Sequence, residues 1–188
     1  YMDKKGKFGA LGHGISDTDT GELLKIEEGE LYQAQILSIV KGVKGTPGEL
    51  SGYIEYQKDK KIGTIEKNTD IGIFGRVDQP QRLQLQEAEI GYKQEVRKGK
   101  AELLTCLENE VKSYEIEITD IYKERADTNK AFALRVTDPE LLAGTGGIVQ
   151  GMSGSPILQD GKLIGAVTHV FVQDSTKGYG IFIENMLW

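Results

Sequence analysis

Short apolar segments, separated by glycine or charged residues, recur along all 188 residues of this chain and restrict the folds open to it. Residues 111–120 show the pattern best, because Tyr114 and Ile116 alternate with Glu115 and Glu117, as in a strand with one buried face. The chain also has 24 glycines against 4 prolines, a composition that favours many tight turns. The sequence therefore predicts an all-β sandwich or barrel.

The same pattern predicts the individual elements. Asp160-Gly161, between two apolar runs, predicts a two-residue hairpin turn. Residues 138–143 predict a short helix with Asp138 as its N-cap and Pro139 at its first position. The expected strands cover residues 8–12, 22–26, 32–40, 51–56, 62–66, 72–77, 87–92, 102–107, 111–120, 131–136, 156–159, 163–172 and 180–184.

The length of the chain fits one ordinary domain or two small packed barrels. Residues 75–86 contain Pro80 and show little periodicity, so we expect the chain to cross there from one half to the other. This division gives an N-terminal half of residues 1–80 and a C-terminal half of residues 81–188.

Composition excludes several classes of function. A net charge of −6 and a pI of about 5.1 argue against a nucleic-acid partner or an anionic membrane surface. No apolar run approaches the length of a membrane span, and no signal-peptide pattern opens the chain. Cys106 is the only cysteine, so no disulfide forms within the chain, and we expect a buried, inert thiol. We expect neither a cofactor nor a metal.

The run of residues 146–157, GGIVQGMSGSPI, places Ser153 between Gly151 and Gly154. Glycine tolerates unusual dihedral angles, so the backbone can bend sharply here and expose its N–H groups. Two such groups beside a serine form an oxyanion hole, which is usually the largest single contribution to acyl-transfer catalysis. The run therefore predicts Ser153 as a nucleophile, with the N–H groups of Gly151 and Ser153 holding the oxyanion.

Other serine or glycine loops fit this run less well. The α/β-hydrolase elbow of esterases and lipases needs a glycine where Ser155 stands and a helix after it, whereas Pro156 opens an apolar strand. A phosphate-binding loop needs a lysine that the run lacks. The pattern that remains is G-x-S-G-[GS]-P of trypsin-like serine proteases. It favours Ser153 as the nucleophile and leaves Ser155 as the rival.

A serine nucleophile needs a base, and histidine suits this role because its pKa lies near neutrality. The chain has two histidines. His13 follows small residues at an expected strand end, where its ring can face a cleft, and we favour it as the base. His169 lies within the apolar run of residues 165–171, where a half-buried structural residue is the first interpretation and a specificity residue the second.

The base in turn needs an acidic or amide partner that fixes its tautomer. The chain has 29 acidic residues, and reasoning from the residues does not choose among them. Asp17 and Asp19 fit a hairpin turn better, and Asp138 is the N-cap already expected. The candidates that stay open are Asp70, Asp78, Asp120 and Asp138.

Residues 10–14, 144–157 and 165–171 together closely resemble the stage IV sporulation protein B peptidases, the S55 family of trypsin-fold serine proteases. The resemblance covers essentially the whole chain. It implies two packed antiparallel β-barrels, with the base in residues 1–80 and the nucleophile in residues 81–188. It also implies a catalytic triad with its active site in the groove between the barrels. The triad residues would be His13, Asp138 and Ser153, and the strand of Thr168, His169, Val170 and Phe171 would form one wall of the substrate pocket.

The resemblance also implies a biological setting. Family peptidases follow a membrane anchor and a PDZ domain, so we expect this chain to be the catalytic domain alone. They are exported to the space between the two membranes of the developing spore, where they process themselves. There they cleave a membrane-embedded regulator of an intramembrane metalloprotease, which then matures the mother-cell sigma factor. The alternative is an inactive or latent binding module on a protease fold.

Overall fold

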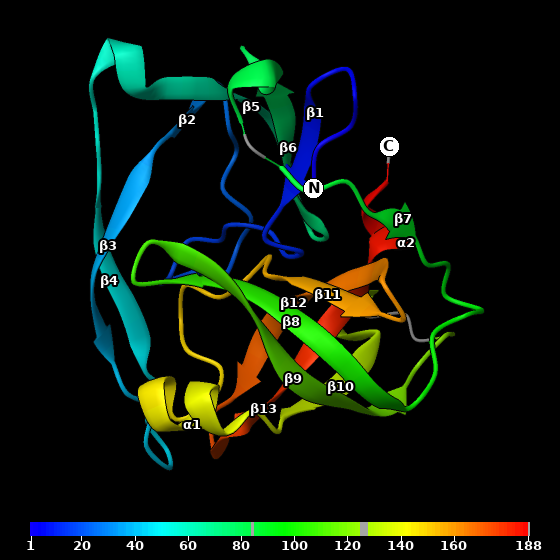
Figure 1. The fold of residues 1–188 in the computed structure, drawn as a ribbon. Coiled ribbons are helices and arrows are strands. Elements are labelled where there is room, and N and C mark those ends of the chain that lie inside the picture. The colour runs from blue at the N-terminus through cyan, green and yellow to red at the C-terminus, as the bar shows by residue number, and fades with distance from the viewer. Residues whose placement is uncertain (84, 125–127, 188) are drawn as a thin grey trace.

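A computed structural model describes residues 1–83, 85–124 and 128–187, which are mostly β-strand (Figure 1). The strands are β1 (Lys7–Ala10), β2 (Gly29–Tyr32), β3 (Ala34–Val40), β4 (Glu49–Ile54), β5 (Lys61–Thr69), β6 (Gly72–Val77), β7 (Glu89–Ile90), β8 (Gly99–Leu107), β9 (Glu110–Ile121), β10 (Phe132–Val136), β11 (Pro156–Gln159), β12 (Lys162–Phe171) and β13 (Asp174–Phe182). The helices are α1 (Pro139–Thr145) and α2 (Ile183–Met186), and 3-10 turns lie at Lys58–Lys60, Pro80–Arg82 and Thr128–Lys130.

The C-terminal half forms a closed antiparallel barrel. Its strands follow the order β11-β8-β9-β10-β13-β12, and β12 pairs again with β11 to close the ring. β7 adds to β12 from outside, in parallel. Alternate side chains of each strand fill the interior, and burying each large one stabilises the fold by about 1.5–3 kcal/mol. Side chains buried in this interior include Leu103, Ile116, Ile118, Phe132, Leu134, Ile157, Ile164 and Phe182.

The N-terminal half contains two further antiparallel sheets. β1, β6, β5 and β2 form a four-stranded antiparallel sheet over a small core of Phe8, Ile73 and Val77. β3 and β4 pair only with each other among the described strands, so the described pairings of this half do not close into a ring. We call this β3–β4 hairpin the arm. It extends from the N-terminal sheet down to α1, along the left side of Figure 1.

The end of the arm reaches the nucleophile loop. The Leu50 N–H donates to the Gln150 carbonyl at 2.8 Å, and the Gln150 N–H donates to the Gly48 carbonyl at 2.8 Å. Gln150 directly precedes Gly151, so the first residues of β4 and the oxyanion loop share one short stretch of backbone pairing. The arm therefore joins the two halves beside the nucleophile.

The structure confirms the predicted turn at Asp160-Gly161 and the predicted start of α1, both of which depend on neighbouring residues. Asp160 and Gly161 both adopt positive φ, 52° and 78°, as a tight turn between β11 and β12 requires. α1 begins after the N-cap Asp138, as expected. Residues 22–26, expected as a strand, form only an isolated bridge through Leu23.

Two further expectations were wrong for reasons of packing. Cys106 is exposed rather than buried, because Thr105 and Leu107 on either side of it in β8 point into the barrel. The expected strand at residues 180–184 ends at Phe182, where α2 begins.

Residue 84, within the expected crossing of residues 75–86, lies outside the described residues. Within the described part of the chain, no helix is long and apolar enough to span a membrane.

Candidate active site

Ser153 lies in a tight turn that is packed against the segment after β1. Gly151 and Gly154 adopt φ of 101° and 85°, in the left-handed region that favours glycine. A Cβ on Gly154 would lie 2.7 Å from the backbone nitrogen of Leu11, so only glycine allows this approach. The Gly154 N–H donates to the Val167 carbonyl at 2.8 Å, which fixes the turn on β12. The nucleophile candidate thus lies between β12 and the start of the His13 segment.

The two candidate serines have different environments. Both serines border the open groove, and the Ser153 hydroxyl donates to the Thr168 carbonyl at 3.2 Å. The Ser155 hydroxyl donates instead to the Thr105 hydroxyl of β8, at 3.2 Å. Ser155 is therefore held toward the barrel wall, and the geometry favours Ser153 as the nucleophile.

The structure brings His13 and His169 together. Their ring centroids lie 5.4 Å apart, with the ring planes tilted by 43°. His13 Nδ1 lies 2.9 Å from the Gly14 carbonyl oxygen, and a carbonyl only accepts, so this hydrogen bond places the proton on Nδ1. Nε2 of the neutral ring then carries the free lone pair, which is the tautomer that a general base requires. His169 is half-buried, as the first sequence interpretation expected, and its ring lies beside that of His13.

The residues before His13 are closely packed against β12 and β13. Gly12 adopts a φ of 74°, and a Cβ there would lie 2.8 Å from Ile181 and 2.9 Å from the methyl carbon of Thr168. Thr168 is the residue whose carbonyl accepts the Ser153 hydrogen bond. The base segment and the nucleophile turn therefore meet at the same residue of β12.

Asn68 clamps the segment that follows His13. Its Oδ1 accepts from the Ile15 N–H at 2.9 Å, and its Nδ2 donates to the carbonyls of Ile15 at 2.7 Å and Leu24 at 3.0 Å. Sequence reasoning missed this residue, since nothing in the local pattern links Asn68 to residues more than forty positions away. Asn68 thus holds the backbone of the segment that follows His13.

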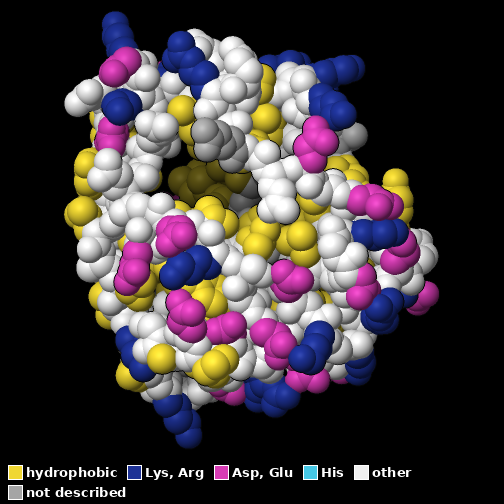
Figure 2. All heavy atoms as spheres, viewed as in Figure 1, with side chains coloured by type: hydrophobic (Ala, Val, Ile, Leu, Met, Phe, Trp, Pro, Cys, Tyr) yellow, Lys and Arg dark blue, Asp and Glu magenta, His cyan; other side chains and the backbone are white. Residues whose placement is uncertain are grey.

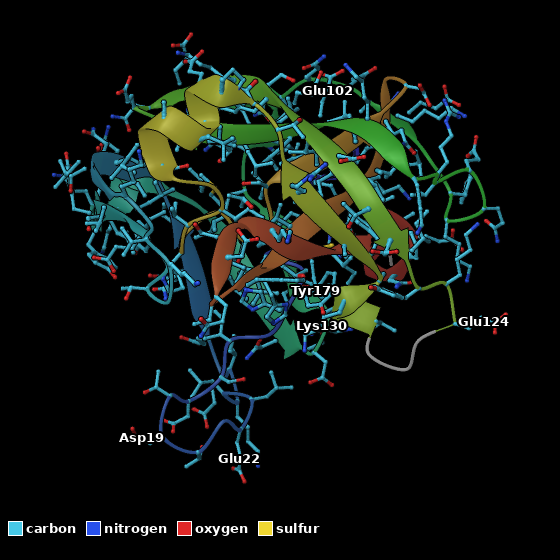
Figure 3. All side chains as sticks on the ribbon, turned by 90° about the horizontal axis from the view of Figure 1, so that it is seen from below. Asp19, Glu22, Glu102, Glu124, Lys130 and Tyr179 are labelled. Carbon is cyan, nitrogen blue, oxygen red and sulfur yellow. The ribbon has the colours of Figure 1, made fainter. Side chains whose placement is uncertain are left out.

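The structure does not bring Asp138 to His13, which corrects the assignment of Asp138 as the triad acid. Its Oδ1 accepts from the N–H groups of Glu140 at 2.9 Å and Leu141 at 3.1 Å, and its Oδ2 accepts from the Glu115 N–H at 3.2 Å. Both carboxylate oxygens are engaged at the start of α1. In Figure 3, α1 lies on the opposite side of the molecule from the loop that carries Asp19 and Glu22. The N-cap interpretation is confirmed.

No described hydrogen bond joins His13 to the carboxylates of the other candidates, Asp17, Asp19, Asp70, Asp78 and Asp120. Asp17 caps its own turn, and its pKa is lowered chiefly by the hydrogen bond from the Thr20 N–H. Asp120 pairs with Lys98 at 2.6 Å. Asp70 is the one whose chain segment lies beside the base, because a Cβ on Gly14 would lie 2.6 Å from the carbonyl oxygen of the adjacent Thr69. Among the residues that the structure describes, no carboxylate hydrogen-bonds to His13.

The expected oxyanion donors are available. The Met152 N–H donates to the Val149 carbonyl at 3.1 Å, which closes the turn. No described residue accepts a hydrogen bond from the N–H groups of Gly151 or Ser153. Two N–H groups that flank a serine hydroxyl and lack a protein acceptor can hold a developing oxyanion.

The expected wall of Thr168, His169, Val170 and Phe171 forms the end of β12. On one edge β12 pairs with β13, with His169 opposite Tyr179. The Thr168 hydroxyl donates to the Asn129 carbonyl at 2.6 Å, and the Phe171 ring lies 4.7 Å from that of Tyr179. On the other edge, the described pairing with β11 stops at Ala166. Figure 3 shows Tyr179 beside Lys130, from the turn before β10.

A groove of about 1850 Å³ opens from Ser153 along the arm. Figure 2 shows this hollow between the arm and the body of the molecule, with hydrophobic side chains on its floor. The apolar residues that line it include Leu50, Ile54, Leu83, Leu104, Val111 and Leu158. The groove can hold an extended chain with apolar side chains. Within the described part of the chain, no cluster of three or more His, Cys, Asp or Glu side chains could hold a metal ion.

Three comparisons with known proteins bear on this site. A model of the SpoIVB peptidase S55 family matches residues 1–187. The active form of the Rv3671c protease from M. tuberculosis is a similar solved structure, with a TM-score of 0.45 and 16% identity over 74% of this chain and 62% of that chain. An inactive form of the Rv3671c protease gives a TM-score of 0.44 and 15% identity over 73% and 69%. This chain thus spans less than two thirds of the active-form chain. A comparison with curated protein sequences gives no match.

Proposed function

Because this chain belongs to the SpoIVB peptidase S55 family, a family of serine endopeptidases, we propose that it cleaves peptide bonds with Ser153 as nucleophile and His13 as base. The observation that carries this proposal is the position of Ser153. Its turn meets the His13 segment at Thr168, opens into the groove, and presents two available N–H groups.

The chemistry proceeds in two stages. Ser153 Oγ attacks the peptide carbonyl carbon, and its proton passes to Nε2 of His13. The C–N bond then breaks, and the same proton moves to the leaving amine. Water next attacks the acyl-enzyme ester and gives a proton to His13. His13 passes this proton to Ser153 Oγ as the ester C–O bond breaks, and the acid product leaves. The N–H groups of Gly151 and Ser153 hold the oxyanion in both stages, and losing one such donor costs about 3–4 kcal/mol in related chemistry.

In this structure a backbone carbonyl takes the orienting role that a carboxylate has in a full triad. The Gly14 carbonyl accepts from Nδ1 of His13 and selects the tautomer, but it carries no negative charge to stabilise the imidazolium. The resting bond from Ser153 to the Thr168 carbonyl must also break before the hydroxyl can reach His13. The described geometry therefore corresponds to a resting form of the site.

A bound substrate can replace the Ser153 hydroxyl as the hydrogen-bond donor to the Thr168 carbonyl. An extended peptide adds to the open edge of β12, at residues 168–171, as a further strand. The N–H of the residue before the scissile bond donates to the Thr168 carbonyl and displaces the Ser153 hydroxyl. The side chain of that residue then lies between residues 168–171 and residues 146–149. The chain on the other side of the scissile bond follows the groove along the arm.

The direct test is cleavage of a mixed peptide library, read by mass spectrometry. Wild-type protein should cleave the library. Ser153→Ala should cleave it more slowly by roughly a thousandfold or more. Ser155→Ala serves as the matched control, because it removes a neighbouring hydroxyl outside the proposed chemistry. Equal cleavage by wild type and Ser153→Ala would remove the peptidase proposal.

A latent binding module on the protease fold is the second candidate, and the resting geometry favours it. The Ser153 hydroxyl is bonded to Thr168, and no described carboxylate stands behind His13. In this case the groove binds a peptide without cleaving it. A serine-directed sulfonyl fluoride separates the two, since a latent site labels no faster in the wild type than in Ser153→Ala.

The proposed biological setting rests on membership of the family and on no feature of the structure. The substrate is a membrane-embedded regulator of an intramembrane metalloprotease, and its cleavage lets the sigma factor of the mother cell mature. In the full-length protein, an anchor and a PDZ domain hold this domain in the space between the spore membranes, where it also processes itself. Sporulating cells that carry Ser153→Ala should accumulate the intact regulator and the immature sigma factor. Normal maturation in those cells would contradict the setting.

A further inference from the structure

The space beside the end of β12 is already filled by the side chain of Ile148. Val170 of β12 stands opposite Gly178 of β13. Ile148 lies directly against Gly178, and Val170 packs on the buried cluster to which Ile148 belongs. A Cβ on Gly178 would lie 2.6 Å from Ile148 Cδ1 and 2.4 Å from the His169 carbonyl oxygen. Ile148 is only 2% exposed. Its methyl groups therefore occupy the room between residues 168–171 and the segment before the nucleophile.

The backbone of this segment is held firmly in place. The Ile148 N–H donates to the Ser175 carbonyl at 2.7 Å, and the Ser175 hydroxyl donates to the Gly146 carbonyl at 2.7 Å. Gly147 adopts a φ of 125°, and a Cβ there would lie 2.2 Å from the same Ser175 carbonyl oxygen. Asp174 accepts from the Thr176 hydroxyl at 2.6 Å and orders the turn from which Ser175 projects. The backbone that carries Ile148 cannot move away from β13 without breaking these bonds.

From this packing we infer that the peptidase takes a small side chain, that of glycine, alanine or serine, on the residue before the scissile bond. The inference rests on the proposed function, in which that side chain points between residues 168–171 and residues 146–149. A leucine or phenylalanine there would compete with Ile148 for the same volume, and interiors tolerate little added volume. Ile148 is thus the specificity-determining residue of this subsite.

The test uses fluorogenic peptides that differ only in the residue before the scissile bond. Wild-type protein should cleave after glycine, alanine or serine on the order of tenfold or more faster than after leucine or phenylalanine. Ile148→Ala should raise cleavage after leucine, relative to alanine, by about tenfold to a hundredfold. Ile148→Val opens less space with less risk to folding, and should shift the same ratio in the same direction.

Ile118→Ala is the matched control. Ile118 is 1% exposed on β9, in the core of the same barrel, and the subsite does not include it. This variant should leave the leucine-to-alanine ratio unchanged. Wild-type protein that cleaves after leucine as fast as after alanine, or Ile148 variants with an unchanged ratio, overturn the inference and leave the proposed function standing. Failure to cleave any peptide defeats the proposed function, and the inference with it.

Discussion

The Ser153 hydroxyl donates to the carbonyl oxygen of Thr168 at 3.2 Å, so the nucleophile and the edge of the substrate-binding strand are joined in the resting site. A hydroxyl whose proton is committed to a carbonyl cannot at the same time give it to His13. In the proposed mechanism, a backbone N–H of the substrate replaces the Ser153 hydroxyl in this bond. Peptide binding therefore promotes the activation of Ser153.

Methylating the peptide nitrogen of the residue before the scissile bond should therefore impair cleavage. This change removes the donor for the Thr168 carbonyl, and one hydrogen bond of about 1.5 kcal/mol corresponds to about a tenfold loss in kcat/KM. The loss should fall mainly on kcat, because Ser153 then stays on Thr168. N-methylation one residue earlier is the control, since that N–H points away from β12 in an extended chain. Equal losses at both positions would contradict the displacement step.

Asn68→Ala should slow catalysis by loosening the segment that carries His13. It removes the hydrogen bonds to Ile15 and Leu24, and small displacements of a catalytic group can lower kcat by about tenfold to a hundredfold. KM should change little, because the groove does not include Asn68. Steady-state kinetics on the best library peptide measures both constants.

Asn109 offers a matched control for this prediction. Its Oδ1 accepts from the Ile36 N–H at 2.9 Å and its Nδ2 donates to the Ile36 carbonyl at 3.1 Å, so it makes the same kind of clamp on the arm. Asn109→Ala should lower stability without the fall in kcat. An equal fall in kcat in both variants would show that Asn68 acts through stability alone.

Asp138 should behave as a helix cap rather than as a catalytic acid. Asp138→Ala removes the acceptor for the N–H groups of Glu140 and Leu141, which costs about 0.5–2 kcal/mol of folding stability. Asp138→Asn keeps one acceptor oxygen and should recover much of that loss. Thermal unfolding measures the stability, and peptide cleavage below the unfolding transition measures the activity. If Asp138→Asn protein is folded but inactive, Asp138 is a catalytic residue after all.

The features that were predicted correctly from the sequence are those that depend on neighbouring residues in the chain. The N-cap at Asp138, the turn at Asp160-Gly161 and the alternating strand of residues 111–120 are set by neighbours in the chain, and all were predicted. The nucleophile turn is local in the same sense, because glycine spacing determines which residues can bend.

The remainder depends on contacts between distant segments. Asn68 acts on Ile15, 53 residues away, and a lone asparagine in a strand carries no sign of its partner. Asp138 matched the order of residues expected for a triad, but order along the chain does not show that its carboxylate is engaged by α1. In the sequence, nothing distinguishes Ile148 from the other apolar residues. The space that its side chain fills becomes visible only when Val170 pairs with Gly178.

Gly151→Ala should reduce the rate with little loss of fold. Gly151 adopts a φ of 101°, and a Cβ there would lie 3.0 Å from Leu50 Cβ on the arm, so alanine would reorient the peptide that carries the oxyanion donor. Loss of one donor lowers kcat by about a hundredfold to a thousandfold. Gly45→Ala introduces a similar backbone strain at φ of 84° in open space, and should keep its rate. Cleavage rates of the two variants, each checked for folding by circular dichroism, give the comparison.

The central claim is that Ser153, activated by His13, is the nucleophile. Its most direct test is labelling with a serine-directed sulfonyl fluoride, followed by mass-spectrometric mapping of the adduct in wild type, His13→Ala, Ser153→Ala and Ser155→Ala. The account predicts an adduct on Ser153 in the wild type and in Ser155→Ala, with labelling lost in Ser153→Ala and slowed by about a thousandfold in His13→Ala. An adduct on Ser155, or a Ser153 adduct that forms equally fast without His13, would contradict it.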